Sequence, residues 1–447
     1  MKKLTLCIGA TIVASAFPLA LVGCGGDDDV NPVPTKDAST EAAADAAPDT
    51  TTDAGPGDAG KDVAIDVVDA STPIPPQLLL SMNNASTSEL LAMDLATKAT
   101  NSLVYAGSLG TTFSRGADPY ALEQKSDVVA RLDPRQPWKV LSSWAVGLDD
   151  KTDGGAAYSD PLAIAVAGTK AYVARYTRNK LAVLDTTETV DAGAPKKSID
   201  LSGFVQAADG DGTVEATFAF TVPTRHLLYV LLGNIDRGKV ASDGFTLLCS
   251  STTPLLVGID TNTDQVTTLG GTGPSGSIVL GGYSPAFGAA GAAAVYDAAG
   301  DRLLVLHGGC NLPLVDGGTG AISKREVEEV ALATGQVKML LDLNAAGFPG
   351  GFAYAGPHDA MLGLGSEVRR WDPTQTTLGA AIPNAPDAYA FAYAGGGVIV
   401  GTRSNFADGG IDVVRTFVAD GGTTTLASNP FKDNSGFIGG VEVWPAP

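Results

Sequence analysis

Residues 161–201 read PLAIAVAGTKAYVARYTRNKLAVLDTTETVDAGAPKKSIDL, and they contain four apolar runs separated by turn residues. The runs cover 162–167, 171–176, 181–187 and 198–201, and none has the 3.6-residue spacing of a helix. The first two runs are apolar at nearly every position, so both of their faces need cover. Four short strands with a doubly buried inner pair are what a β-propeller blade requires, because each blade packs face to face on its neighbours.

The third run, apolar residues that lead into an aspartate or a turn, recurs along the chain. Seven matches are found, at 91–94, 129–133, 181–185, 256–260, 327–334, 368–372 and 413–420. No Pro/Gly-rich linker divides them, so residues 77–447 are predicted to form one domain. The sequence therefore predicts an all-β fold, a seven-bladed β-propeller, with weak strand signals around residues 107–147.

The two ends of this domain predict how the ring closes. Only one strand, residues 78–82, precedes the first match, and a spare strand, residues 436–444, follows the last. A C-terminal strand that completes the first blade would remove two open sheet edges. We therefore expect closure by the C-terminal strand.

The N-terminus carries the features of an export signal. Lys2 and Lys3 precede an apolar run over residues 4–21. The following Leu21-Val22-Gly23-Cys24 resembles the lipobox of bacterial lipoproteins. The resemblance implies that residues 1–23 are a signal peptide and that Cys24 carries acyl chains, which would hold the protein on a membrane. Ordinary signal cleavage and an uncleaved anchor are the alternatives.

Residues 24–76 are predicted to be a disordered tether. Between residues 25 and 76 the chain has twelve acidic residues and two lysines, a net charge of −10 out of −20 for the whole chain, and no aromatic residue. Such a segment cannot bury enough apolar surface to offset its ordering entropy. The residue after Cys24 is Gly25, whereas inner-membrane retention signals have an Asp there. The three aspartates at 27–29 resemble signals that send lipoproteins to the cell surface. We therefore expect an outer-membrane or cell-surface location.

Two stretches resemble a known family of propellers. Residues 171–187 resemble a YVTN-type repeat, in which a Tyr-Val strand turns into a Val-x-Asp strand. Residues 209–215, 228–232, Asp236-Arg237 and 256–260 resemble elements of uncharacterised YVTN-type propeller lipoproteins of bacteria, with departures at Thr213 and Asn234. The resemblance implies a fold and a cellular address, and it supplies no activity.

The long loops predict where a binding surface lies. Connections between successive blades, and between the second and third strands of a blade, share one face of a propeller, and the long insertions fall in these two classes. They include Asp149 and Asp153 in one loop and Asp209, Asp211 and Glu215 in another. Asp-x-Asp-Gly followed by a carboxylate suits a hard cation, so we expect Ca²⁺ at Asp209, Asp211 and Glu215. A solvated Asp-Gly turn is the alternative.

The remaining chemistry-bearing residues are few. Cys249 and Cys310 are the cysteines outside the signal, and an exported domain favours a disulfide between them, with two buried thiols as the alternative. His307 is the histidine nearest the long loops, and it belongs either to the channel mouth or to the structure. No nucleophile elbow or phosphate loop is present in the sequence.

These features favour a membrane-anchored, non-catalytic binding or scaffold protein. Its ligand is an unidentified protein, glycan or small molecule at the loop-rich face of the channel, and the net charge of −20 disfavours nucleic acid. The alternative is a hydrolase- or lyase-type propeller enzyme whose active site is assembled from several blades, since such a site need leave no local motif.

Overall fold

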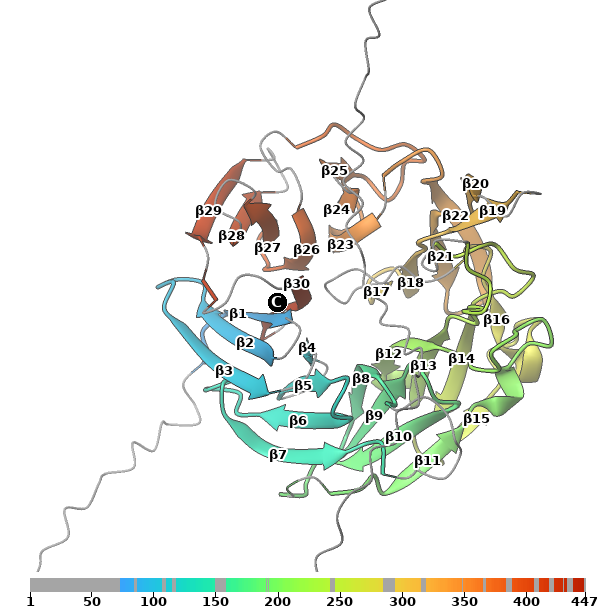
Figure 1. The fold of residues 1–447 in the computed structure, drawn as a ribbon, viewed down its shortest axis with the longest axis horizontal. Coiled ribbons are helices and arrows are strands. Elements are labelled where there is room, and N and C mark those ends of the chain that lie inside the picture. The colour runs from blue at the N-terminus through green and yellow to red at the C-terminus, as the bar shows by residue number, and fades with distance from the viewer. Residues whose placement is uncertain are drawn as a thin grey trace, which may run out of the picture. The chain divides into compact units, whose positions relative to one another are not determined.

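The strands of the chain form a ring of sheets within a compact unit, Ile74–Pro447 (Figure 1). The computed structural model describes residues 73–83, 87–106, 110–114, 118–148, 158–189, 191, 193–241, 246–283, 294–314, 319–347, 349–364, 367–382, 388–405, 410–417, 422–428, 430–431 and 437–445. Within these ranges the regular elements are strands and three short 3₁₀-helices, so the all-β prediction is confirmed. No helix in these ranges is long and apolar enough to cross a membrane.

The stretch 161–201 forms one four-stranded antiparallel sheet, as the sequence predicts. Its strands are β8 (Pro161–Ala167), β9 (Lys170–Arg175), β10 (Lys180–Asp185) and β11 (Lys197–Asp200). Gly168 makes the first turn with φ of +61°, a conformation that suits glycine. The strand β9 is buried on both faces from Ala171 to Ala174, which explains why these four residues are apolar.

The other sheets are numbered here by their order along the chain, with the sheet just described as sheet 3. Sheets 1 and 2 precede it: sheet 1 has β30 (Phe437–Trp444), β1 (Gln77–Asn83), β2 (Thr87–Asp94) and β3 (Thr100–Ala106); sheet 2 has β4 (Gly110–Ser114), β5 (Pro119–Glu123), β6 (Val128–Leu132) and β7 (Val140–Ala145).

Sheets 4 and 5 follow sheet 3 and carry the largest insertions. Sheet 4 has β12 (Ala216–Val222), β13 (Leu227–Leu232), β14 (Leu255–Asp260), β15 (Gln265–Thr267) and β16 (Ile278–Val279); sheet 5 has β17 (Ala294–Asp297), β18 (Arg302–Leu306), β21 (Glu326–Ala331) and β22 (Gln336–Asp342). Both β15 and β16 pair with β14, so together they supply the outer edge of sheet 4. The hairpin β19 (Cys310–Pro313) and β20 (Thr319–Ser323) lies between β18 and β21 in the chain.

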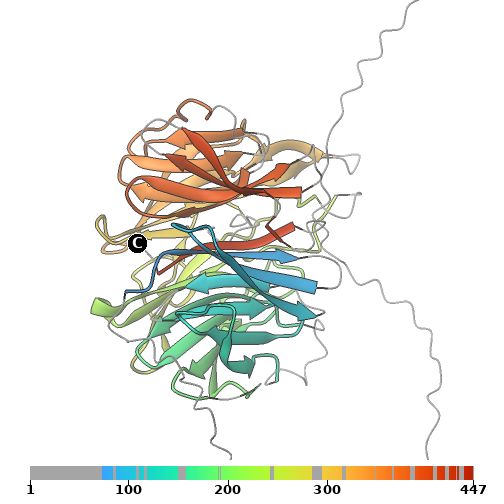
Figure 2. The same cartoon turned by 90° about the vertical axis from the view of Figure 1, so that its left-hand side faces the viewer.

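The last two sheets complete the set. Sheet 6 has β23 (Pro349–Gly356), β24 (Asp359–Leu364) and β25 (Glu367–Trp371); sheet 7 has β26 (Ala388–Tyr393), β27 (Val398–Asn405), β28 (Gly410–Phe417) and β29 (Thr423–Ser428). The 3₁₀-helices are η1 (Ser202–Phe204), η2 (Pro223–Arg225) and η3 (Pro274–Gly276). Figure 2, turned by 90°, shows the strands running between the two faces of the ring.

Clusters of buried apolar side chains join each sheet to the next. Such clusters link sheets 1 and 2, 2 and 3, 3 and 4, 4 and 5, 5 and 6, 6 and 7, and finally 7 and 1. The cluster between sheets 3 and 4 includes Tyr172, Val183, Val230 and Ile259, which are fully or almost fully buried. The core of the domain therefore lies between the faces of neighbouring sheets, as in a propeller.

The number of complete blades differs from the sequence prediction. Sheets 1, 2, 3, 4, 5 and 7 have four strands or more, whereas sheet 6 has three in the described residues. After β25 the chain returns beside this strand, with an isolated bridge between Arg369 and Ala381. Gly379 N–H donates to Arg370 O at 2.9 Å, and Ile382 N–H donates to Val368 O at 2.8 Å. Six complete blades are thus present in the described residues where seven were expected, because this fourth segment of sheet 6 is too irregular to form a strand.

The predicted closure is confirmed. The C-terminal strand β30 pairs antiparallel with β1, with Leu80 opposite Val441 and Leu78 opposite Val443 (Figure 1). It takes the inner position of sheet 1, and the buried Trp444 packs with Leu79. The first and last strands of the domain therefore share one blade, and neither leaves that edge open.

Candidate functional site: the loop-rich face

Strand order places the long connections on one face of the ring. Connections from the fourth strand of a sheet to the next sheet, and from second to third strands, lie at the same ends of the strands. Here they comprise residues 146–160, 176–179, 201–215, 233–254, 268–293 and 307–325. We call this surface the loop-rich face. The predicted loops therefore fall together, although residues 149–157 are outside the described residues and Asp149 and Asp153 with them.

The acidic turn 209–215 surrounds an arginine from another loop. Arg237 Nε lies 2.9 Å from Asp211 Oδ2, and the Arg237 backbone N–H donates to the same oxygen at 3.0 Å. The Arg237 guanidinium also donates to Thr213 Oγ1 at 2.9 Å and lies 3.4 Å from Glu215 Oε1. We call these residues, Asp211, Thr213, Glu215 and Arg237, the Arg237 cluster. Its members come from the two loops that flank sheet 4's first two strands.

Glu215 is the most buried acid of this cluster, with an exposed fraction of 0 %. Burial, assisted by the charge of Asp211, raises the pKa of Glu215 to about 8, against the hydrogen bond that Ile235 N–H donates to Oε2 at 2.8 Å. Its backbone has φ of +44°, which is uncommon for a residue with a side chain. Burial therefore makes Glu215 hold its proton more tightly than an exposed glutamate does.

Thr213 lies between the two acids of the cluster. Its hydroxyl contacts Asp211 Oδ1 at 2.6 Å and also Glu215 Oε1, and it can donate its one proton to either oxygen. Burial works against ionisation of Asp211, but hydrogen bonds from Arg237 and Thr213 outweigh it, so the pKa of Asp211 is lowered and its carboxylate is charged. The Thr213 hydroxyl therefore links a charged aspartate to a buried glutamate.

Neighbouring loops from sheets 2 and 3 complete the surroundings of Arg237. The guanidinium carbon of Arg237 lies 5.5 Å from the centre of the Tyr176 ring, a cation–π distance. Burial, with the charge of Asp127, raises the pKa of Asp160 to about 6, while Arg237 and Arg178 act in the opposite direction. Residues from four loops therefore meet at Arg237.

The predicted Ca²⁺ ligands differ in their contacts with Arg237. Asp211 and Glu215 are held by Arg237, whereas Asp209 accepts from Asp211 N–H at 3.2 Å through Oδ1, and its Oδ2 has no partner in the described residues. Burial and the charge of Asp211 raise the pKa of Asp209. Within the described ranges no three His, Cys, Asp or Glu side chains form a metal-holding group. Ca²⁺ stays a prediction, and Arg237 is a competing cation that the sequence analysis did not consider.

His307 belongs to a second cluster, between sheets 4 and 5. It is 0 % exposed, and its Nε2 lies 2.8 Å from Glu328 Oε2, off the direction of a good hydrogen bond. Glu328 in turn accepts the Gly281 N–H at 2.9 Å and 3.1 Å. A Cβ at Gly282 would lie 2.2 Å from His307 Cγ, so only glycine lets this loop cover the ring. His307 is therefore sealed under the loop and does not face the channel mouth.

Two glutamates beside His307 differ in their acidity. Burial and the charge of Glu328 raise the pKa of Glu326 to about 7. Burial opposes ionisation of Glu328 too, but contacts with His307 and the backbone N–H groups of Gly281 and Gly282 outweigh it and lower its pKa. Glu328 is thus the charged member that fixes the loop over His307.

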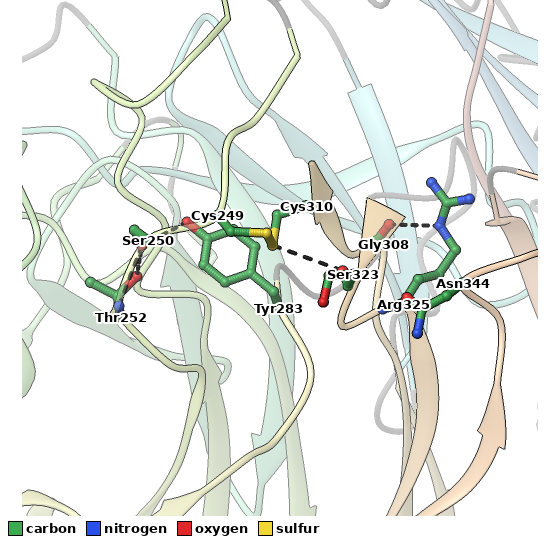
Figure 3. Close-up of a disulfide and its surroundings, with 9 residues drawn as sticks. All are labelled: Cys249, Ser250, Thr252, Tyr283, Gly308, Cys310, Ser323, Arg325 and Asn344. Atoms are coloured by element: carbon green, nitrogen blue, oxygen red, sulfur yellow. Dashed lines mark hydrogen bonds between the residues drawn. A yellow bond between two sulfur atoms is a disulfide. The ribbon is translucent and has the colours of Figure 1, made fainter. Parts of the chain in front are cut away.

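The predicted disulfide is present. Cys249, in the β13–β14 loop, and Cys310, at the start of β19, are joined by an S–S bond of 2.03 Å (Figure 3). Beside it, the Tyr283 hydroxyl lies 2.9 Å from Ser250 Oγ, and Ser250 Oγ lies 2.6 Å from Thr252 Oγ1. The bond therefore links an insertion of sheet 4 to an insertion of sheet 5.

Sequence reasoning missed Arg237, Tyr176, Asp160 and Glu328. Arg237 follows Asp236 in the stretch already compared with propeller lipoproteins, so its presence was visible but its partners were not. Glu328 lies in the acidic run 326–329, which reads as an exposed strand face. Cys24 and the rest of residues 1–72 lie outside the described residues, so lipidation and the tether stay predictions.

Comparison with solved structures relates the chain to other propeller-containing proteins at low sequence identity. Hydrazine synthase of Kuenenia stuttgartiensis matches with a TM-score of 0.51 at 17% identity, covering 79% of this chain and 99% of that chain. AztD of Citrobacter koseri matches with a TM-score of 0.45 at 10% identity, covering 82% and 97%. No protein-family model and no curated protein sequence matches. The ring of sheets makes the chain a β-propeller, and the comparisons show a likeness of fold alone.

Proposed function

We propose that the protein is a non-catalytic binding or scaffold protein, and that it docks a partner protein on the loop-rich face. The observation that carries this proposal is a set of exposed apolar side chains on that face. Leu148 and Tyr158 flank the loop before sheet 3, with exposed fractions of 41 % and 40 %, and Leu312 and Leu314 lie on the β19–β20 insertion, at 46 % and 49 %. Exposed apolar groups beside polar loops are typical of protein interaction sites.

The charges of the same face support binding over catalysis. The acids and bases described there hold the loops together: Arg237 pairs with Asp211 and Glu215, and Glu328 pairs with His307 and backbone N–H groups. A propeller enzyme would need a titratable group that reaches its substrate. His307 and Glu328, which come closest to an acid–base pair, are almost fully buried, so we favour binding.

We further propose the cellular setting that the N-terminus implies. Cleavage before Cys24, acylation of Cys24 and a tether of residues 25–76 would present the domain at the outer membrane or cell surface. The Cys24→Ser substitution should move the full chain from the membrane fraction to the soluble fraction. Retention of that variant in the membrane with its signal intact would instead indicate an uncleaved span.

We also propose that sheet 6 is the seventh blade of the ring. Its strands pack on both neighbours, through the cluster of Trp371 with sheet 5 and that of Met361 with sheet 7. The Arg369–Ala381 bridge and the hydrogen bonds that join residues 379–382 to residues 368–370 mark the position of a shortened fourth strand. An experimental structure that keeps sheet 6, with residues 379–382 along β25, between sheets 5 and 7 would support this count. A structure without sheet 6 at this position would refute it.

The binding proposal is tested by capture with matched variants. The full chain, solubilised with its anchor, is used to capture cross-linked proteins from a detergent extract of the cell envelope. The double variant Leu312→Asp, Leu314→Asp should lose a specific captured protein by about tenfold or more, because apolar anchors dominate interface energies. Met339→Asp, at a 52 % exposed site on β22, is the control and should retain it. Equal capture by all three proteins would contradict docking at this insertion.

A further inference from the structure

The insertions of sheets 4 and 5 together build one small sheet on the loop-rich face. Val240 pairs antiparallel with Leu247, and Leu248 pairs in parallel with Asn311 of β19, which itself pairs with β20. The Asn311 N–H donates to Leu247 O at 3.0 Å, and Cys249 N–H donates to Asn311 O at 2.9 Å. We call this unit, residues 239–241, 246–249, β19 and β20, the accessory sheet. It draws its strands from two blades.

The disulfide lies where the β13–β14 loop of sheet 4 meets β19 of the sheet 5 insertion. Cys249 ends the strand from sheet 4, and Cys310 begins the strand from sheet 5, so the covalent bond crosses the parallel pairing (Figure 3). Cys310, Tyr283 and Ile235 form one buried cluster with Leu247 and Cys249 packed against it. Tyr283 is tied on both sides, since its N–H donates to Lys324 O at 3.1 Å and its carbonyl accepts from Gly309 N–H at 2.9 Å.

The buried cluster around the disulfide contacts the Arg237 cluster through one residue, Ile235. Ile235 packs under the disulfide with its side chain, while its backbone N–H donates to Glu215 Oε2 at 2.8 Å. Two residues further on, Arg237 binds Asp211 and Glu215. The two preceding residues are held independently, because Gly233 N–H donates to Glu215 O at 2.8 Å and Asn234 N–H donates to Val214 O at 3.2 Å. A displacement of the accessory sheet would therefore act on the Ile235 side chain and on the hydrogen bond from its N–H to Glu215.

We propose that the Cys249–Cys310 bond is a redox-sensitive strap that holds the accessory sheet down and so keeps Ile235 closed over Glu215. With the bond intact, the β13–β14 loop cannot separate from β19. With the bond reduced, the parallel pairing is held only by hydrogen bonds and side-chain packing, and the loop can open. This inference does not depend on which partner the face binds.

The reduction step is an ordinary exchange with a dithiol. Cys310 is 1 % exposed and Cys249 is partly exposed, so the reductant's thiolate attacks Cys249 Sγ and expels the Cys310 thiolate, which takes up a proton. The second thiol of the reductant attacks the mixed disulfide and releases Cys249, which is protonated in turn. Two electrons pass from the dithiol, which becomes a cyclic disulfide.

The groups around Glu215 define what opening would change. On its own loop Glu215 faces Asp211 and Thr213, the β13–β14 loop supplies Arg237 and the Ile235 N–H, and the β9–β10 turn supplies Tyr176. If the strap opens, water reaches Glu215 and ionisation becomes easier. The exchange of the Ile235 amide hydrogen with solvent is the most local report of this opening.

The test is site-resolved amide hydrogen exchange on the full chain, before and after treatment with dithiothreitol. We expect protection of the Ile235 and Asn311 amides to fall by about tenfold or more on reduction, while the Leu181 amide in sheet 3 stays unchanged. The variant Cys249→Ala, Cys310→Val keeps the cluster filled and should show the lowered protection without reductant, and no further change with it.

Two results would overturn the proposal. One is unchanged protection of Ile235 in a protein whose Cys249 and Cys310 are both shown to be free thiols by alkylation. The other is loss of protection throughout the ring, Leu181 included, because the bond would then support the whole fold rather than a local strap.

Discussion

The aspartates that cap turns on one face of the ring and Glu215 on the other face have pKa values shifted in opposite directions. Asp94, Asp185, Asp260 and Asp372 end the third strands of four sheets, on the face opposite the long loops, and each accepts hydrogen bonds from the turn that follows. These bonds lower the pKa of each carboxyl. On the loop-rich face, burial raises the pKa of Glu215 to about 8.

This difference separates architecture from site. The repeated aspartates that reveal the blades in the sequence cap short turns. Each carboxylate accepts hydrogen bonds from the backbone of the turn that ends its blade's third strand. Glu215, by contrast, is buried without full compensation, a condition that proteins keep at few positions. Glu215, which lies outside the repeated pattern, is therefore more informative about function than the turn-capping aspartates.

The largest expected effect is on the pH dependence of stability. The pKa of Glu215 is about 8 in the folded protein and about 4.5 when unfolded, so the folded state binds the proton more tightly. Stability from this group is complete below pH 4.5 and is lost as pH rises towards 8. At about 1.4 kcal/mol per pKa unit, the ceiling is about 5 kcal/mol.

The measurement is urea unfolding from pH 5 to 9 for wild type and Glu215→Gln. In the variant, the free energy of unfolding should lose the part of its pH dependence that comes from Glu215. The contributions of Asp160 and Glu326, whose pKa values are also raised, should remain in both proteins. Parallel pH profiles for the two proteins would mean that Glu215 is charged in the native state.

The second expected effect follows removal of the Arg237 charge. Arg237→Ala leaves Asp211 beside Glu215 without a counter-ion, and unfolding free energy should fall by about 2–3 kcal/mol. The control is Arg369→Ala, whose 2.7 Å pair with Glu367 is solvent-exposed and should be worth less than about 1 kcal/mol. Equal losses in denaturant unfolding would contradict a special role for the Arg237 cluster.

A smaller effect is expected at a turn cap. Asp260 Oδ1 accepts the N–H groups of Asn262 and Thr263, both at 2.9 Å. Asp260→Ala should lower the free energy of unfolding slightly, and the loss should disappear in acid as the wild-type carboxylate is protonated. A loss that persists unchanged at pH 2–3 would show that the carboxylate charge does not act at this turn.

The smallest effect concerns Ca²⁺. If Arg237 is the cation of the acidic turn, the wild-type melting temperature should be the same in excess chelator and in millimolar Ca²⁺, and Asp209→Ala, Asp211→Ala should respond no differently. A wild-type melting temperature that rises with Ca²⁺ concentration, and a variant that does not respond, would establish the calcium site expected from the Asp-x-Asp-Gly spacing.

The fold was largely readable from local patterns. All seven matches of the pattern begin on third strands, β2, β6, β10, β14, β21, β25 and β28. In five of them an aspartate caps the following turn, which leaves a local mark in the sequence. Closure was readable too, because one spare strand lies at each end of the domain and β30 covers the edge of β1. The short fourth strand of sheet 6 was not, because the few bonds of residues 379–382 to β25 leave no sequence period.

The site was readable only in part. Asp211 and Glu215 were found from their spacing. The disulfide was predicted because Cys249 and Cys310 are the cysteines outside the signal and an exported domain favours oxidation. Arg237 comes from a loop 22 residues beyond Glu215, and the Arg237 cluster forms only when loops from neighbouring blades meet. For His307 the sequence left a channel-mouth role and a structural role open, because nothing local shows that Gly281 and Gly282 cover its ring.

The most direct test of this comparison is a carbon-13 NMR titration of the side-chain carboxyls, assigned with Glu215→Gln and Asp260→Ala. We predict that Glu215 titrates near pH 8, while Asp260 titrates below the usual 3.8 of an aspartate. A Glu215 midpoint near 4.5, like that of an ordinary exposed glutamate, would contradict a buried, protonated acid at the centre of the loop-rich face.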